Sequence, residues 1–235
     1  MNSPTPTPEQ LHILGTYALA TTHERHHGRR WYVDALEQAL DIARAHEVSL
    51  LSVVGVIAAL SPNNRWERNL LDAENLIRAF KVSPDAAKAV KVSTYGKNKE
   101  KALDILDSDL FSLDELLSLL KGPKISAFAC AILADSGHLD AAENERALQS
   151  VVVDGHAYSI WAGERLTMDQ IPNIGVRLRE RIEADYRAAA SALCALGEDV
   201  TPSQVQAVTW VAHRRIHGVD REVGIERPGR NPHES

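Results

Sequence analysis

Two segments decide the fold: Leu116–Leu133, with the sequence LLSLLKGPKISAFACAIL, and Val151–His156, with the sequence VVVDGH. In the first segment, one apolar stretch ends at Lys121-Gly122 and another begins at Pro123-Lys124. Proline is favoured in the first turn of a helix, and a turn that contains glycine exposes N–H groups at the start of the next helix. We therefore predict two short helices joined by a tight turn, and a start of the second helix that suits a phosphate.

The second segment places a carboxylate, Asp154, between an apolar run and the next helix. Asp is a good N-cap, so capping alone explains the residue, and a catalytic role is compatible with capping. Val151–Val153 is the only strand-like run in the sequence, and three β-branched residues do not make a sheet. The segment therefore predicts a carboxylate at a helix start rather than a strand.

Helical signals continue on both sides of these segments. Val48–Leu60 is apolar on nearly every side, which predicts a central buried helix. Starts with a capping residue followed by proline, or with a capping box, recur at Thr7-Pro8, Ser83-Pro84, Ser112–Glu115 and Thr201-Pro202. We predict an all-α protein. We predict that residues 1–217 form one two-lobed helical domain with two helices joined by a hairpin at about 113–134, and that residues 218–235 form a loose C-terminal tail.

Composition excludes several classes of protein. The chain has 235 residues and a net charge of -6, which excludes a generally basic nucleic-acid coat protein but not a local basic groove. Two cysteines, Cys130 and Cys194, are too few for a disulfide framework, a four-cysteine metal site or an iron–sulfur cluster. No signal peptide opens the sequence and the longest apolar run is too short for a bilayer, so we expect a cytoplasmic protein without a membrane partner.

The order of four motifs resembles the helix-hairpin-helix DNA glycosylase superfamily. The turn at Lys121–Lys124 followed by Val153-Asp154-Gly155-His156 is similar to that family's hairpin and its V-D-x-H motif. Ile57–Asn64 resembles the family's L-S-x-Q-T segment, and Tyr95–Ala102 resembles its Y-x-x-K-A-x-x-I segment. The resemblance extends from about Val48 to Trp161. It implies a monomer without a cofactor that binds duplex DNA, flips out a base, and is nucleoid-associated or phage-encoded.

Several features depart from the family pattern. The hairpin is shortened to Lys-Gly-Pro-Lys, and Pro123 removes one backbone donor that a phosphate would use. The insert Asp135–Ser150 lengthens the loop before Asp154, and the iron–sulfur cysteines of some members are absent. The residues after Thr201 resemble instead phage and actinobacterial relatives of this fold, some of them assigned to thymine hypermodification rather than repair.

Within this resemblance, two residues are catalytic candidates. Asp154 would stabilise the positive charge that develops on the sugar when an N-glycosidic bond breaks, or would activate a water. Lys124 aligns with the nucleophilic lysine of bifunctional glycosylases, although Lys121 also fits that position, and the alternative for either is contact with a phosphate.

Other residues are candidates for contact with DNA or for the pocket. The DNA-binding candidates are Asn63, Asn64, Arg65, Lys97, Lys121, Gly122 and Arg214. The further pocket candidates are His156, Arg29, Arg30, Gln206 and Trp210. Ordinary explanations compete with these roles: an Asx turn for the asparagines, solvated surface for the charged residues and core packing for Trp210. The adjacent pair His26 and His27 suits chelation from one helix face poorly, and we expect no metal site.

Three functions remain open. The leading hypothesis is an N-glycosylase that removes a modified or damaged base, with Asp154 at its centre. The second is a transferase of the hypermodification type, in which an amine or amino acid replaces a leaving group on an activated thymine. The third is a catalytically inert DNA-binding module. An abasic product, a changed base mass and binding without turnover distinguish the three.

Overall fold

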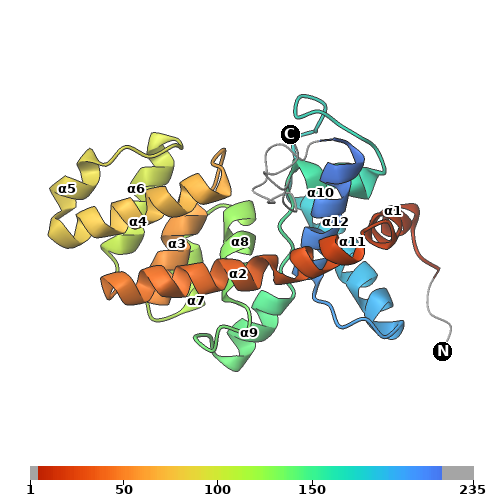
Figure 1. Ribbon diagram of the computed structural model, residues 1–235, viewed down its shortest axis with the longest axis horizontal. Helices are drawn as coiled ribbons and strands as arrows, with labels where there is room; N and C mark the ends of the chain where they lie inside the picture. The colour runs from red at the N-terminus through yellow and green to blue at the C-terminus, as the bar shows by residue number, and fades with distance from the viewer. Residues whose placement is uncertain (1–4, 219–235) are drawn as a thin grey trace, which may run out of the picture.

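The computed structural model describes residues 5–218 and contains helices and no strand in that range (Figure 1). The all-α prediction is therefore confirmed. The helices are α1 (Pro8–Ala18), α2 (Thr22–His46), α3 (Leu50–Leu60), α4 (Trp66–Val82), α5 (Pro84–Ala89), α6 (Gly96–Leu106), α7 (Leu113–Leu120), α8 (Pro123–Leu133), α9 (Ala141–Leu148), α10 (Gly155–Ala162), α11 (Val176–Ala195) and α12 (Pro202–Ile216). The predicted tail lies outside the described residues, apart from Gly218.

Local capping explains where many helices begin. Thr7 and Ser112 form the predicted capping boxes, in which the N-cap side chain accepts from a backbone N–H three residues later and that residue's side chain accepts in return. Thr201, predicted as a capping residue before a proline, forms a capping box as well. Ser83 caps α5, and Pro84 takes its first position. The two short helices α7 and α8 are joined by Lys121 and Gly122, as the first segment predicts.

The buried apolar side chains form two separate clusters. The first surrounds α3, whose residues are all buried, and includes side chains of α2 and of α4 to α9. The second is built by α1, α10, α11 and α12. Figure 1 shows the two lobes side by side, with the long helix α2 extending from one lobe to the other.

The run Val151–Val153 is the crossing between the lobes. Val151 and Val153 belong to the second cluster, whereas Val152 between them belongs to the first. Successive side chains of an extended segment point in opposite directions, so a single strand-like run can serve two cores without pairing in a sheet. This crossing delivers Asp154 to the boundary between the lobes.

Helices α2 and α12 hold the lobes together by a close approach at Gly28. A Cβ atom added to Gly28 would lie 2.5 Å from Val208 Cα, which is backbone and cannot turn away. Four residues later on α2, Tyr32 donates a hydrogen bond to Gln206 of α12. Glycine is therefore required at position 28 because the two helix backbones are too close to admit a side chain. No special backbone conformation is needed there.

Within residues 5–218, no single helix is long and apolar enough to cross a membrane. Helices α2 and α3 pass that test only as a joined pair, and they are bent by 119° at the break between them.

We expect Gly28→Ala to destabilise the protein by at least the ~1–3 kcal/mol typical of an overpacked core, because the added methyl group forces α2 and α12 apart. The measurement is chemical denaturation. Gly15→Ala is the matched control, since Gly15 also lies in a helix and nothing lies within 4 Å of its added Cβ. That control should be neutral or stabilising by up to about 1 kcal/mol. Equal stability of the two variants would contradict the close packing of α2 on α12.

Candidate functional site

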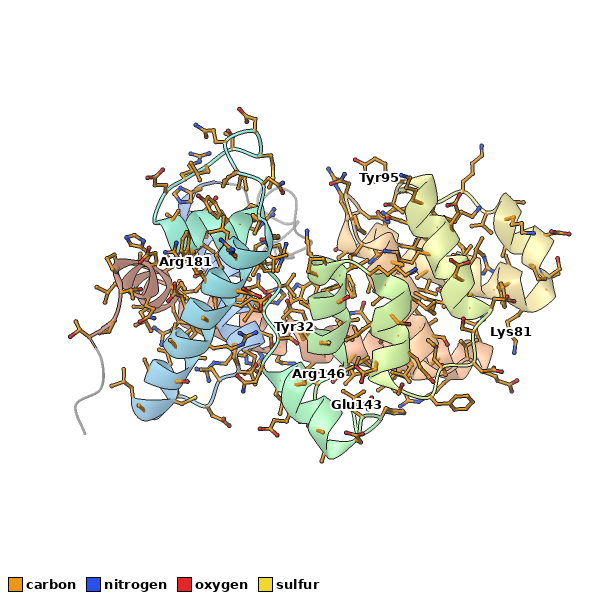
Figure 2. All side chains as sticks on the ribbon, turned by 180° about the vertical axis from the view of Figure 1, so that it is seen from behind. Tyr32, Lys81, Tyr95, Glu143, Arg146 and Arg181 are labelled. Atoms are coloured by element: carbon orange, nitrogen blue, oxygen red, sulfur yellow. The ribbon has the colours of Figure 1, made fainter. Side chains whose placement is uncertain are left out.

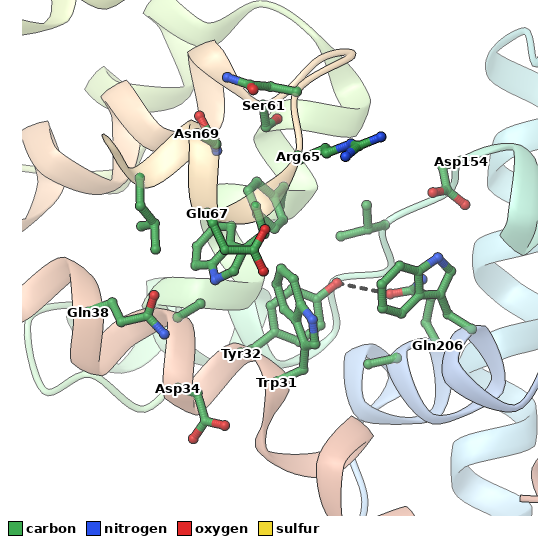
Figure 3. A pocket seen from close by; sticks show the side chains of 18 of the residues that line it. Trp31, Tyr32, Asp34, Gln38, Ser61, Arg65, Glu67, Asn69, Asp154 and Gln206 are labelled. Carbon is green, nitrogen blue, oxygen red and sulfur yellow. Dashed lines mark hydrogen bonds between the residues drawn. The ribbon is translucent and has the colours of Figure 1, made fainter. Parts of the chain in front are cut away.

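A cleft with a volume of about 680 Å³ lies between the two lobes (Figure 3). Its walls come from α2, the α3–α4 turn, α4, α8, the crossing segment and α12. The lining residues are His27, Trp31, Tyr32, Asp34, Ala35, Gln38, Ser61, Asn64, Arg65, Trp66, Glu67, Asn69, Leu70, Lys124, Phe128, Val152, Asp154, Gln206, Ala207, Trp210 and Arg214. A cleft of this size is in the range that holds a drug-sized ligand, ~300–1,000 Å³.

Aromatic rings form a continuous cluster along the cleft. Trp31 lies at its centre, with ring centroids 5.1 Å from Trp66, 5.8 Å from Phe128 and 6.3 Å from Trp210. The rings are tilted or edge-on to one another rather than stacked in parallel. Large rings held in this way offer faces and edges to a planar or cationic ligand.

One hydrogen bond fixes the inner wall. The buried Tyr32 hydroxyl donates to Gln206 Oε1 at 2.9 Å, and the dashed line in Figure 3 marks this bond. Burial raises the pKa of Tyr32, and the negative charge of Asp154 raises it further, so the hydroxyl keeps its proton. Because the amide oxygen of Gln206 is engaged, the orientation of the whole amide group is set.

Asp154 is held at the start of α10 by the capping role that its sequence position predicts. Its Oδ1 accepts from Ala157 N at 2.9 Å, and the residue lines the cleft. Arg179 donates to Val153 O at 3.2 Å and steadies the crossing segment directly before the carboxylate. Capping occupies one carboxylate oxygen, and Oδ2 has no hydrogen-bond partner within residues 5–218.

Three cations line the same cleft: Arg65, Lys124 and Arg214. Lys124 is solvent-exposed in the first turn of α8. The guanidinium of Arg214 lies over the ring of Trp210, with 5.1 Å between its Cζ and the ring centroid, and its residue is buried. Arg65 is exposed at the N-cap position of α4, and Figure 3 shows its side chain on the same side of the cleft as Asp154.

Four helices in the described part of the chain lack a side-chain cap: α4, α6, α8 and α11. Helices α6 and α8 begin within motif segments, beside Lys97 and Lys124, and α4 begins directly after the segment Ile57–Asn64, beside Arg65. The starts of α4 and α6 are tied together, because Asn63 Nδ2 donates to the Tyr95 hydroxyl at 2.6 Å. Uncapped N–H groups and the positive end of the helix dipole favour an anion at each start.

The structure thus brings seven of the sequence-predicted residues to one cleft: Asp154, Lys124, Asn64, Arg65, Gln206, Trp210 and Arg214. Asn64 contributes structurally as well, since its Nδ2 donates to Asp72 Oδ2 at 3.2 Å. Asn63, Lys97, Lys121 and Gly122 lie outside the lining but belong to the uncapped starts or the segments beside them. Lys121, with φ of 51°, is the left-handed C-cap of α7.

Three further candidates lie outside the cleft lining. Arg29 donates to the Tyr17 hydroxyl at 2.7 Å and forms an ion pair with Glu198. Arg30 forms an ion pair with Asp34 at 2.8 Å. Asp34 lines the cleft and Arg30 does not. These contacts explain both arginines as structural residues of α2.

His156 is the third of these candidates and packs on α12. Its ring centroid lies 6.0 Å from that of His213. Burial, with the charges of His217, His156 and Arg165, lowers the pKa of His213 to about 4. No group of three or more His, Cys, Asp or Glu residues between residues 5 and 218 has the arrangement of a metal site.

Sequence reasoning missed the α2–α4 side of the cleft. Trp31 and Trp66 recur at helical spacing with core residues, and that spacing indicates packing rather than a pocket. Glu67 and Asn69 sit in the first turns of α4 directly after Arg65, and no motif marks them. Only the meeting of α2 with α4 reveals that these side chains share one cavity.

The fold and the site define an all-α protein with a polar and aromatic cleft between two lobes. Residues 2–217 match a family described as "Family of unknown function (DUF7178)", and the chain belongs to this family. No curated protein and no solved structure matches the chain.

We expect Tyr32→Phe to cost about 1–3 kcal/mol of stability, because the buried Gln206 Oε1 loses its donor. Gln206→Met removes the other partner, and the double variant should lose at least about 0.5 kcal/mol less than the sum of the single variants. Chemical denaturation of the two single variants and the double variant gives the three changes in unfolding free energy that a double-mutant cycle needs. Tyr158→Phe is the matched control, since its hydroxyl has no hydrogen bond with another described residue, and it should stay within about 0.5 kcal/mol of the parent. Strict additivity would show that the bond does not couple the helices.

Proposed function

We propose that the protein is a DNA base-processing enzyme, most directly an N-glycosylase, that receives a flipped base in the cleft with Asp154 at its centre. The observation that carries this proposal is the position of Asp154. One carboxylate oxygen is fixed by the cap of α10 and the other remains for chemistry, in a cleft between two lobes that Arg65, Lys124 and Arg214 also line.

The rim of the cleft supports contact with a polyanion. The chain is acidic overall, with a net charge of -6, yet three uncapped helix starts coincide with basic residues near one edge. Phosphate groups suit such starts because backbone N–H groups and the helix dipole both favour negative charge. Tyr95 at the start of α6 is 62% exposed and gives this edge an aromatic ring on which a base can stack (Figure 2).

Entry of a base follows from the size and lining of the cleft. A base inside a duplex cannot be reached by a side chain, so an enzyme that acts on it must turn it out into a pocket. The aromatic cluster around Trp31 replaces the stacking that such a base loses. The donors and acceptors of Gln206 and Asp154 lie on the wall beside it.

In the proposed reaction, the bond between the base and C1′ of the sugar breaks and the base leaves with the bonding electrons. The developing positive charge on the sugar is stabilised by Asp154, and a water supplies the new oxygen on C1′ while its proton passes to the carboxylate. Lys124 is solvent-exposed, which supports phosphate contact rather than a desolvated amine nucleophile.

The transferase is the second candidate, and the volume of the cleft favours it. A space of about 680 Å³ has room for a base and for a second group beside it. In that reaction Asp154 would accept a proton from the attacking amine, and Lys124, Arg65 and Arg214 would hold an anionic leaving group.

Binding to duplex DNA should fall steeply with salt, because neutralising phosphates releases counterions. Lys124→Ala and Lys97→Ala should each lower the slope of log affinity against log salt by about one. Lys81→Ala is the matched control, since Lys81 lies at the other end of α4 from the uncapped start (Figure 2). Affinity that does not depend on salt, or no binding at low salt, would remove DNA from the proposal.

Asp154→Asn should keep the fold and abolish most of the activity. Asn caps helices as well as Asp, so stability should change by about 1 kcal/mol or less. Removal of the negative charge should lower turnover roughly a hundredfold or more, while duplex binding persists or tightens slightly. Product analysis by mass spectrometry measures turnover, and denaturation measures stability.

Asp140→Asn is the matched control for that variant. Asp140 caps α9 through Glu143 N at 2.8 Å and does not line the cleft, so activity should be unchanged. Full activity in a folded Asp154→Asn protein would defeat both enzymatic candidates, and unfolding of that variant would show a mainly structural role.

A further inference from the structure

Gln206 is a buried polar residue in the wall of the cleft, and only one end of its amide group is used. The residue lies on α12, lines the cleft and is 5% exposed. Its Oε1 accepts from Tyr32, whereas its Nε2 donates no hydrogen bond within residues 5–218. Polar groups of buried residues are nearly always paired in native proteins, so an unpaired N–H2 group in a cavity wall indicates a ligand that carries an acceptor.

The unpaired Nε2 atom is accessible from the cleft. Asn69 also lines the cleft, but its Oδ1 is both unpaired and sealed from solvent. The Nε2 atom of Gln206 is unpaired without being sealed. Because the rest of Gln206 is buried and the cleft is the space that the residue lines, a ligand in the cleft meets this N–H2 group first.

Tyr32 determines which end of the amide group is available. Its hydroxyl donates to Gln206 Oε1 at 2.9 Å (Figure 3) and has no other hydrogen-bond partner within the described residues. Burial, followed by the negative charge of Asp154, raises the pKa of Tyr32, so the hydroxyl keeps a proton that needs an acceptor. If the amide group turned over, that buried proton would lose its acceptor. The oxygen is therefore held against Tyr32, and the N–H2 group is left for a ligand.

A carbonyl oxygen is the group of a nucleobase that matches this donor. Thymine, uracil and guanine carry a carbonyl oxygen on the edge remote from the sugar, whereas cytosine and adenine carry an amino group there. Two N–H2 groups that face each other form no hydrogen bond, and both are removed from water. The ring of Trp31 lines the cleft, and its centroid lies 5.0 Å from that of Tyr32, so an aromatic surface for a planar ring accompanies the donor.

We propose that Gln206 is the specificity-determining residue of the cleft: its N–H2 group, oriented by Tyr32, donates to a carbonyl oxygen of the flipped base. The cleft takes a base with a carbonyl oxygen on the edge remote from the sugar and disfavours cytosine and adenine. Tyr32 is a positioning residue, because it acts through Gln206. This inference deepens the proposed function and rests on it for the identification of the ligand as a base in DNA.

The primary test uses two small probes of the same shape on the DNA-free protein. 1-Methyl-2-pyridone carries a carbonyl oxygen beside a methyl group and has no N–H or O–H donor, and o-xylene has a second methyl group in place of the oxygen. Titrations followed by NMR spectroscopy give the dissociation constants. Gln206→Met should weaken binding of the pyridone about threefold or more, the scale of one neutral hydrogen bond, and should not weaken binding of o-xylene.

Two further variants test the orientation of the amide group. Tyr32→Phe frees the amide of Gln206 to turn, so the pyridone should bind more weakly while o-xylene binds as before. Gln38→Met is the matched control, since Gln38 lines the cleft from α2, away from Gln206 (Figure 3), and it should leave both probes unaffected. Pyridone binding that survives Gln206→Met, or an equal loss of both probes in that variant, would overturn the inference.

Duplexes test whether the carbonyl oxygen belongs to a base. Two duplexes carry a single uracil or a single cytosine opposite an abasic analogue, and a 2′-fluorine on that nucleotide prevents cleavage of the glycosidic bond. The uracil duplex should bind about threefold or more tighter, and Gln206→Met should remove the difference. Equal binding of the two duplexes overturns the inference and leaves the proposed function standing. Pyridone binding that depends on Gln206, without any binding of DNA, keeps the carbonyl site and rejects the proposed function.

Discussion

The packing of α2 on α12 is the constraint on which the rest of the structure depends. Gly28 lets the two helices approach until backbone meets backbone at Val208, and the bond from Tyr32 to Gln206 sets how they are turned. Helix α12 contributes Ala207 to the first hydrophobic cluster and Val208 to the second, so this contact also joins the two cores.

The cleft is a direct consequence of that joint. Helix α2 supplies Trp31 and Tyr32, α12 supplies Gln206 and Arg214, and the crossing segment carries Asp154 to the place where the two helices meet. Because alternate valines of the crossing segment are buried in different cores, the carboxylate cannot shift along the chain without removing a valine from its cluster. The carboxylate of Asp154 is therefore held at a fixed place in the wall of the cleft.

Short-range sequence patterns predicted most of the helices. The cleft could not be predicted in the same way, because it is formed by contacts between helices that are far apart in the sequence. The capping boxes at Thr7 and Ser112, the cap followed by proline at Thr201, and the turn between α7 and α8 depend on residues close in sequence and were correctly predicted. The motif order also placed Asp154 and Lys124 together. The positions of Trp31 and Glu67 in the cleft lining could not be predicted, because helical spacing does not distinguish a side chain that fills a core from one that faces a cavity.

The most direct test of the central claim is amide hydrogen exchange of the protein with and without saturating duplex DNA. The N–H groups at the starts of α4, α6 and α8 lack side-chain caps and should exchange rapidly in the unbound protein. If phosphates occupy these starts and a base enters the cleft, exchange should slow there and in the first turn of α10. The start of α11 is also uncapped but lacks a neighbouring motif, so it should not change. Protection elsewhere, with these three starts unaffected, would contradict the account.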